Sequence, residues 1–127
     1  MNPRTILIVD DEAEMLEVLS KKLSAEGYQV INARTGKEAI EKAKIYLPDI
    51  ILMDIVLPDM EGSDAIKTLQ ADPQTESIPS IFLSGIITRD EGDQPSEINV
   101  GGRLYNAIGK PFSFDELLSE IETHVGD

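Results

Sequence analysis

The sequence predicts an α/β fold, a single doubly wound domain in which a five-stranded parallel sheet lies between two layers of helices. Short apolar or β-branched runs of strand length alternate with segments in which apolar residues recur at helical spacing. Because strand–helix–strand connections are right-handed, this alternation makes the strands parallel and covers both faces. The 127 residues, 41% of them hydrophobic, suffice for one core, so we expect one domain, residues 1–127.

The expected strands are mostly continuous apolar runs. This is typical of parallel strands, because helices cover both of their faces. The fourth run is entered through Pro79, and the first and third each end directly before an aspartate. In chain order the expected strands cover residues 6–9, 28–33, 50–53, 81–83 and 104–108.

Apolar stripes and capping signals mark the helices. A capping box with Thr35 and Glu38 opens the second helix, and a similar pattern over residues 113–116 opens the last. Gly27 and Pro48 are placed to end the first and the second helix. The stripes consist of residues 15, 16, 19 and 23, then 39, 40, 43 and 47, then 65, 66 and 69, and finally 117, 118, 121 and 125.

One stretch, Asp90 to Gly102, interrupts the alternation. The β–α rhythm requires a helix between the fourth and fifth strands, but Gly92, Pro95, Gly101 and Gly102 each oppose helix continuation. The few apolar residues there would give such a helix only a thin buried face. We therefore expect an irregular or mobile loop, with the helix weak or missing.

The charge of the chain limits its partners. Eleven basic and 24 acidic residues give a net charge of −13, which repels nucleic-acid phosphates and anionic lipid and suits basic proteins and divalent cations. There is no cysteine, no apolar run long enough to span a membrane, and no signal-peptide pattern after Met1. The sequence predicts a soluble cytoplasmic protein that starts at its true N-terminus.

Reactive side chains follow four of the expected strands. Asp10 and Asp11 follow the first strand, Asp54 the third, Ser84 the fourth and Lys110 the fifth. In open parallel α/β sheets, ligands bind beyond the carboxyl ends of the strands. We therefore expect these side chains to share one crevice.

The chemistry of this set points to phosphoryl transfer. Three carboxylates within a few ångströms repel one another by about 4 kcal/mol per close pair at an effective dielectric near 20, so they favour a bound cation. Oxygen ligands without His or Cys favour Mg²⁺. Lys110 and the Ser84 hydroxyl suit phosphoryl oxygens, and Asp54 is then the nucleophile of an aspartyl-phosphate reaction.

The same residues carry a family resemblance over the whole chain. Residues 6–12, 53–62, 83–84 and 110–112 form, in this order and spacing, a pattern that resembles the response-regulator receiver domains of bacterial two-component systems. The resemblance implies a flavodoxin-like strand order, 2-1-3-4-5. It also implies a sensor histidine kinase or phosphotransfer protein as the phosphoryl donor and a downstream effector protein or attached output domain as the target. The chain would catalyse only its own phosphorylation and dephosphorylation.

The resemblance also implies roles for individual residues. Asp11 would bind Mg²⁺ directly and Asp10 mainly through water, and the main-chain carbonyl of Val56 would complete the coordination beside Asp54, the phosphoacceptor. Ser84 and Lys110 would contact the phosphoryl oxygens. On the same basis we expect a cis peptide bond between Lys110 and Pro111.

The chain departs from the family pattern at the expected switch. Family members usually carry an aromatic residue three positions before the lysine, where this chain has Ala107. Tyr105 lies on the same face of the strand by period-2 alternation and is a candidate substitute. The interval from Ser84 to Lys110 is also several residues longer than is usual in the family. Both departures concern signal output, and we expect ordering of residues 90–102 around Ser84 to transmit the signal.

Three other functions remain as alternatives. A receiver fold that has lost switching would serve as a protein-interaction module, and phosphorylation of Asp54 tests this. A flavodoxin-like cofactor carrier needs a phosphate-binding loop after the first strand, where Asp10 and Asp11 would repel the phosphate. An aspartate-nucleophile phosphatase needs a second acid two residues after the nucleophile, where this chain has Val56.

Overall fold

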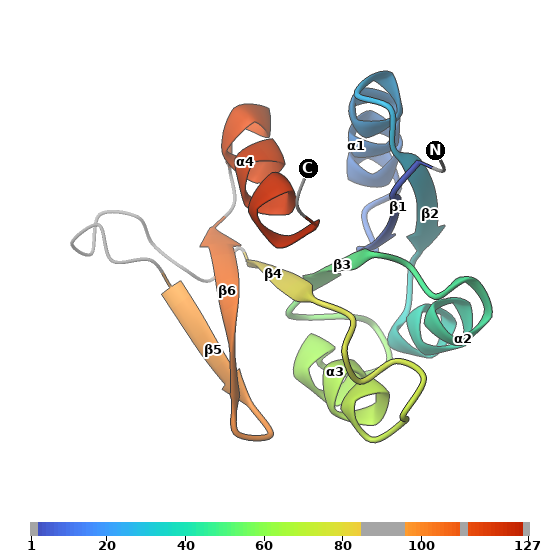
Figure 1. Ribbon diagram of the computed structural model, residues 1–127, viewed down its shortest axis with the longest axis vertical. Coiled ribbons are helices and arrows are strands. Elements are labelled where there is room, and N and C mark those ends of the chain that lie inside the picture. The colour runs from blue at the N-terminus through green and yellow to red at the C-terminus, as the bar shows by residue number, and fades with distance from the viewer. Residues whose placement is uncertain (1–2, 85–95, 110–111, 126–127) are drawn as a thin grey trace.

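A computed structural model describes residues 3–84, 96–109 and 112–125 (Figure 1). Within these ranges the chain forms one six-stranded sheet with the order β2-β1-β3-β4-β6-β5 and four helices. The elements are β1 Thr5–Val9, α1 Ala13–Ala25, β2 Gln29–Ala33, α2 Gly36–Tyr46, β3 Ile50–Asp54, α3 Gly62–Gln70, β4 Ser80–Ser84, β5 Ser96–Val100, β6 Arg103–Gly109 and α4 Phe114–Val125.

The predicted parallel sheet is confirmed. Strands β2, β1, β3, β4 and β6 pair in parallel in this order, and β6 is the fifth strand that the sequence predicted. Helices α1 and α4 cover one face of the sheet, and α2 and α3 cover the other (Figure 1). In the described ranges, no helix combines the length and the apolar character needed to cross a membrane.

The core has two halves, one on each face of the sheet. Residues 6–9 of β1 and 50–53 of β3 are fully buried and alternate between the halves, as period-2 side-chain direction requires. The half under α2 and α3 contains, among others, Leu7, Val9, Ile51, Met53 and Phe82. The half under α1 and α4 contains, among others, Ile6, Ile8, Leu52, Ile81, Leu83, Leu117 and Ile121. Each large side chain buried in this way contributes roughly 1.5–3 kcal/mol.

The capping predictions for the helices are confirmed. The Thr35 side chain accepts a hydrogen bond from the Glu38 N–H at 3.0 Å and starts α2. The Ser113 side chain accepts from the Glu116 N–H at 3.0 Å in the first turn of α4. Gly27, with φ +98°, follows the end of α1 in the left-handed conformation that glycine tolerates best.

The expectation of an irregular loop over residues 90–102 is wrong for the second half of this stretch. Residues 96–100 form β5, which pairs antiparallel with β6 at the edge of the sheet. Gly101 and Gly102 have φ values of +59° and +85° and make the two-residue turn between the strands. Two successive residues with positive φ are the signature of a type I′ hairpin turn. The glycines that oppose a helix are therefore hairpin signals, and the expectation for residues 90–95 lies outside the described residues.

Helix α3 holds this hairpin in place. The Gln70 side-chain amide donates to the Val100 carbonyl at 3.0 Å and to the Tyr105 hydroxyl at 2.7 Å. Ile98 and Val100 pack on the core half under α2 and α3, and Tyr105 meets Phe82 edge to face with ring centroids 5.8 Å apart. These contacts compensate for the chain entropy that ordering the hairpin costs.

Candidate functional site

The carboxyl ends of β1 and β3 bring three aspartates together. Asp54 is the last residue of β3, and Asp10 comes directly after Val9, the last residue of β1. The two strands pair with Val9 opposite Met53, so Asp10 and Asp54 occupy neighbouring positions at one edge of the sheet. A carboxylate oxygen from each of Asp10, Asp11 and Asp54 lies within 4.8 Å of the other two. The structure thus assembles the cluster expected at the strand ends.

Burial differs among the three acids. Asp10 is fully buried and Asp54 is 8% exposed, whereas Asp11 is open to solvent. The main-chain N–H of Asp10 donates to the Ala33 carbonyl at 3.1 Å, and its carboxylate accepts from the Glu12 N–H at 2.9 Å. Asp10 is therefore held in a fixed orientation, while Asp11 remains accessible from outside.

The donor set of this cluster fits a hard divalent cation. When both are ionised, the buried carboxylates of Asp10 and Asp54, no more than 4.8 Å apart, repel each other by roughly 3.5 kcal/mol at an effective dielectric near 20. A cation among them removes this cost. All three donors are carboxylate oxygens, which Mg²⁺ prefers, and the exposed side of Asp11 leaves room for water and phosphate ligands. Asp10, Asp11 and Asp54 would hold such an ion.

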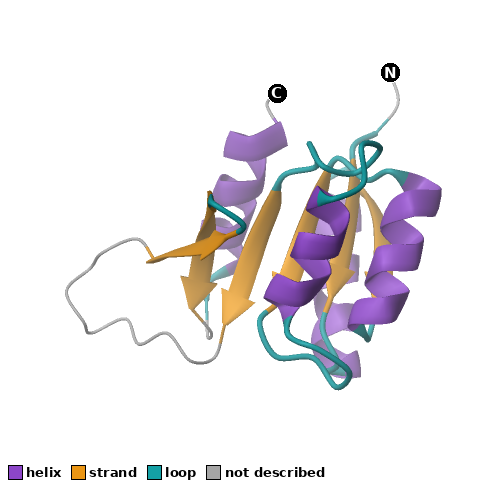
Figure 2. Ribbon diagram, turned by 90° about the horizontal axis from the view of Figure 1, so that it is seen from below, coloured by secondary structure: helices purple, strands orange, loops and turns teal. Residues whose placement is uncertain are grey.

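The main chain of β4 and β6 ends at the same edge of the sheet (Figure 2). Leu83 lies opposite Asp54, and the next residue, Ser84, lies opposite Gly109, which directly precedes Lys110 in the sequence. The Ser84 side chain, Lys110 and the expected cis bond to Pro111 lie outside the described residues. Their predicted roles therefore rest on the order of the strands and on the sequence.

The loop after Asp54 turns back sharply to start α3. The Gly62 N–H donates to the Ile55 carbonyl at 2.7 Å, and Val56 forms an antiparallel bridge with Glu61. A Cβ atom at Gly62 would lie 2.1 Å from the Asp54 carbonyl oxygen, so only glycine fits there. This places Val56 two residues beyond Asp54 in a tightly closed loop, and metal binding by its carbonyl stays a prediction.

The two candidate switch residues of β6 lie on one face, as predicted from the alternation. Tyr105 is buried in the core half under α2 and α3, and Ala107 packs against the same half. Ala107 lies opposite Phe82 of β4. The Tyr105 ring is held between Gln70 and Phe82. A switching role for either residue stays a prediction.

Comparison with known proteins decides the family. The model of the response regulator receiver domain matches residues 6–122. The chain belongs to this family. The polar-differentiation response regulator DivK of Brucella anthropi is 32% identical to it over 98% of both chains. A probable cyclic di-GMP phosphodiesterase of Vibrio cholerae is 38% identical over 95% of this chain, which spans only 26% of that relative.

Solved receiver structures share the fold of this receiver domain. The receiver domain of a sensor histidine kinase from Pseudomonas aeruginosa PAO1 is 25% identical, with a TM-score of 0.81 over 98% of this chain and 99% of its own. That structure has a magnesium ion coordinated in its active-site cleft. The receiver domain described above presents its three aspartates in the same fold.

Two residues that support the site escape sequence reasoning. The Asp59 carboxylate accepts from the N–H groups of Gly36 and Lys37 at 2.8 and 3.0 Å. The hydrogen bond from Gly36, which has the largest effect, and the one from Lys37 hold the pKa of Asp59 below its ordinary value. The Arg34 guanidinium donates to the Asp11 carbonyl at 3.0 Å. Both contacts join segments more than 20 residues apart, and no local pattern signals them.

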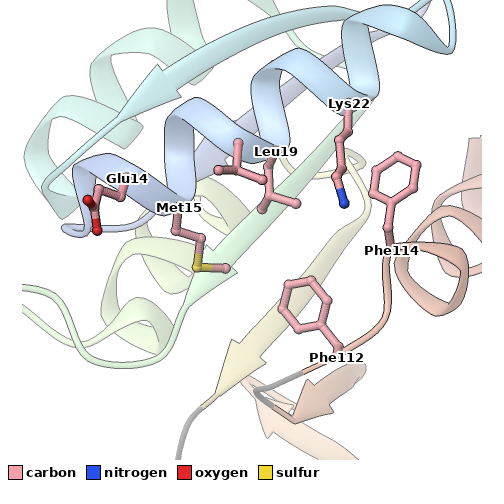
Figure 3. A pocket seen from close by; sticks show the side chains of 7 residues that line it. Glu14, Met15, Leu19, Lys22, Phe112 and Phe114 are labelled. Carbon is pink, nitrogen blue, oxygen red and sulfur yellow. The ribbon is translucent and has the colours of Figure 1, made fainter.

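An apolar hollow of about 360 Å³ lies beside α1. Figure 3 shows Met15 and Leu19 of α1 on one side and Phe112 and Phe114 on the other. The Lys22 ammonium lies 5.4 Å from the centre of the Phe114 ring. Met15 lies in the first turn of α1, which follows the segment of Asp10 and Asp11 in the sequence.

Proposed function

We propose that this chain, residues 1–127, is one receiver domain that accepts a phosphoryl group on Asp54 in a Mg²⁺-dependent reaction. The observation that carries this proposal is the nearly buried Asp54 carboxylate within 4.8 Å of the acidic oxygens of Asp10 and Asp11, at the carboxyl edge of the sheet. Membership in the receiver family supports it.

The proposed chemistry is a direct phosphoryl transfer. An Asp54 carboxylate oxygen forms a bond to phosphorus while the bond between phosphorus and the donor's imidazole nitrogen breaks, and the imidazole leaves with the electron pair. When bound, Mg²⁺ neutralises the charge that the phosphoryl oxygens share with the carboxylates. Asp10, Asp11, Asp54 and the Val56 carbonyl would hold the ion, and Ser84 and Lys110 would contact phosphoryl oxygens.

We assign the donor role to a histidine kinase or phosphotransfer protein. The donor's phosphohistidine must come within bonding distance of Asp54. The donor's surface must therefore contact the surface of this domain around the acidic cluster. The apolar hollow beside α1 supports this, because Met15, Leu19 and Phe112 offer a partner an apolar area, and α1 starts directly after the segment of Asp10 and Asp11. The net charge of −13 favours protein partners over nucleic acid.

We further propose that phosphorylation changes the conformation of the domain and so controls an effector protein or an attached output domain in the cytoplasm. The chain would act catalytically only on its own phosphorylation and dephosphorylation. The phosphodiesterase relative carries its activity in a protein about four times as long, and we do not extend that activity to this chain.

A single experiment tests the proposal. The wild-type domain is incubated with acetyl phosphate and MgCl₂, then with acetyl phosphate and EDTA, and its intact mass is measured. We expect one phosphate per chain with Mg²⁺ and none with EDTA, and none on Asp54→Asn in either case. Absence of phosphate from the wild type would favour the protein-interaction module, and phosphate on Asp54→Asn would show that another residue is the acceptor.

A further inference from the structure

The first turn of α2 contacts the loop that follows the candidate phosphoacceptor. Asp59 in that loop uses both carboxylate oxygens, one on the Gly36 N–H at 2.8 Å and the other on the Lys37 N–H at 3.0 Å. The first N–H groups of a helix have no partner within the helix, and the helix dipole there favours a negative charge. Asp59 thus acts as a distant capping residue for α2.

Packing makes this junction close. A Cβ atom at Gly36 would lie 2.4 Å from Met60 Cγ and 2.5 Å from its Sδ, so the Met60 side chain lies directly on the helix start. Within the loop, the Leu57 N–H donates to the Met60 carbonyl at 3.1 Å. Because the loop is closed on itself, the anchor at Asp59 also restrains Val56, three residues earlier.

The same junction also holds the opposite side of the site. Arg34, next to the N-cap residue of α2, donates from its guanidinium to the main-chain carbonyl of Asp11 at 3.0 Å. The Arg34 N–H in turn donates to the Glu38 carboxylate at 2.8 Å. Residues 34–37 therefore contact both segments that carry candidate metal ligands, the one with Asp11 and the one with Val56.

We infer that the first turn of α2 sets the spacing between these two segments, with Asp59 as a positioning residue for the metal site and Arg34 as its counterpart. Asp59 touches neither the metal nor the phosphoryl group in this scheme. It acts by holding the Val56 loop. The inference rests on the proposed function, because it concerns the Mg²⁺ affinity of the same site.

The test compares Asp59→Asn and Asp59→Ala with Glu61→Gln. Glu61 is an exposed acid in the same loop that starts α3 without a side-chain cap, so its variant removes one charge and leaves the anchor intact. Mg²⁺ affinity is measured by titration with MgCl₂ alone, with amide chemical shifts as the readout. We expect Asp59→Ala to weaken Mg²⁺ binding roughly 10-fold, as loss of an outer-shell support does, with Asp59→Asn intermediate and Glu61→Gln within about twofold of wild type.

Three further measurements separate positioning from charge and from stability. At saturating Mg²⁺, the rate of phosphorylation by acetyl phosphate should return to within about twofold of wild type, because only metal binding is impaired. A purely electrostatic effect would appear equally in Glu61→Gln and fade at about 0.5 M KCl, because salt screens exposed charges. A purely structural effect would lower the folded fraction while the folded molecules kept the wild-type affinity.

For Arg34→Gln, the direction of the change in Mg²⁺ affinity decides between positioning and charge. This test remains available even if Asp59→Ala fails to fold. Removing a positive charge beside three carboxylates would tighten Mg²⁺ binding if charge alone mattered, whereas loss of positioning weakens it. Wild-type affinity in Asp59→Ala, or tighter binding in Arg34→Gln, overturns the inference alone. Absence of Mg²⁺ binding by the wild type overturns the proposed function, and the inference with it.

Discussion

Replacing Asp11 by Asn should stabilise the metal-free domain while impairing metal binding. The Asp11 carboxylate lies within 4.8 Å of oxygens of both Asp10 and Asp54. Because Asp11 is exposed, we take the dielectric of water, at which each ionised pair at this distance costs about 0.9 kcal/mol. Relief of both repulsions raises the free energy of unfolding by about 2 kcal/mol, which for a domain of this size raises the Tm by roughly 6 °C.

Added Mg²⁺ should narrow the stability difference between Asp11→Asn and the wild type. With a dissociation constant of roughly 1 mM, 10 mM Mg²⁺ stabilises the wild type by about 1.4 kcal/mol, because the ion binds only the folded state. Asp11→Asn lacks one carboxylate ligand and should gain little. The expected 6 °C difference should therefore shrink to about 2 °C in 10 mM MgCl₂.

Thermal unfolding followed by circular dichroism, with EDTA or with MgCl₂, measures both effects. Glu14→Gln is the matched control, because Glu14 is an exposed acid in the first turn of α1 and outside the cluster. Its loss removes a favourable interaction with the helix dipole and should lower stability slightly. If Asp11→Asn in EDTA unfolded at or below the wild-type temperature, the three acids would not be in net repulsion and the electrostatic case for a cation would fail.

Three further outcomes are expected. In a chemical-shift titration, Mg²⁺ should move amides near Asp10, Asp11, Asp54 and Val56, and shifts confined to the acids at 90, 91 and 93 would mean that the metal binds elsewhere. Gln70→Ala should lower the free energy of unfolding by about 1–3 kcal/mol through the loss of two hydrogen bonds and should speed amide exchange in β5. Unchanged exchange there would show that the Gln70 hydrogen bonds do not hold the hairpin. The pKa of Asp59 is lowered from 3.8 in the folded state, so its contribution is present above that value and lost as the pH falls through the lower folded pKa. The stability difference between wild type and Asp59→Asn should thus be constant near neutral pH and vanish in strong acid, and a difference that changed between pH 6 and 8 would contradict this assignment.

Sequence reasoning succeeded where short-range patterns determine structure. Buried strands such as residues 50–54 show as apolar runs, and the strand ends then bring Asp10 and Asp54 together by topology alone. The Thr35 cap was visible because its partner lies three residues away. These features depend on neighbouring residues or on the common right-handed crossover, and both can be read from one chain.

The misses have different causes. Gly101 and Gly102 oppose a helix but equally signal a two-residue hairpin turn, so β5 has a local signal that the search for a helix overlooks. The capping of α2 by Asp59 joins positions 22 and 23 residues apart. Long-range partners of this kind decide local structure without leaving a local signal.

The close approach of Gly62 to the Asp54 carbonyl has a mechanical consequence. Asp54 ends a central strand packed on both faces, and the next helix begins against the main chain of Asp54. A close-packed interior has low compressibility, so a phosphoryl group on Asp54, as proposed, would meet a strand that yields little. Any rearrangement would then fall to the less tightly packed loops around the acidic cluster.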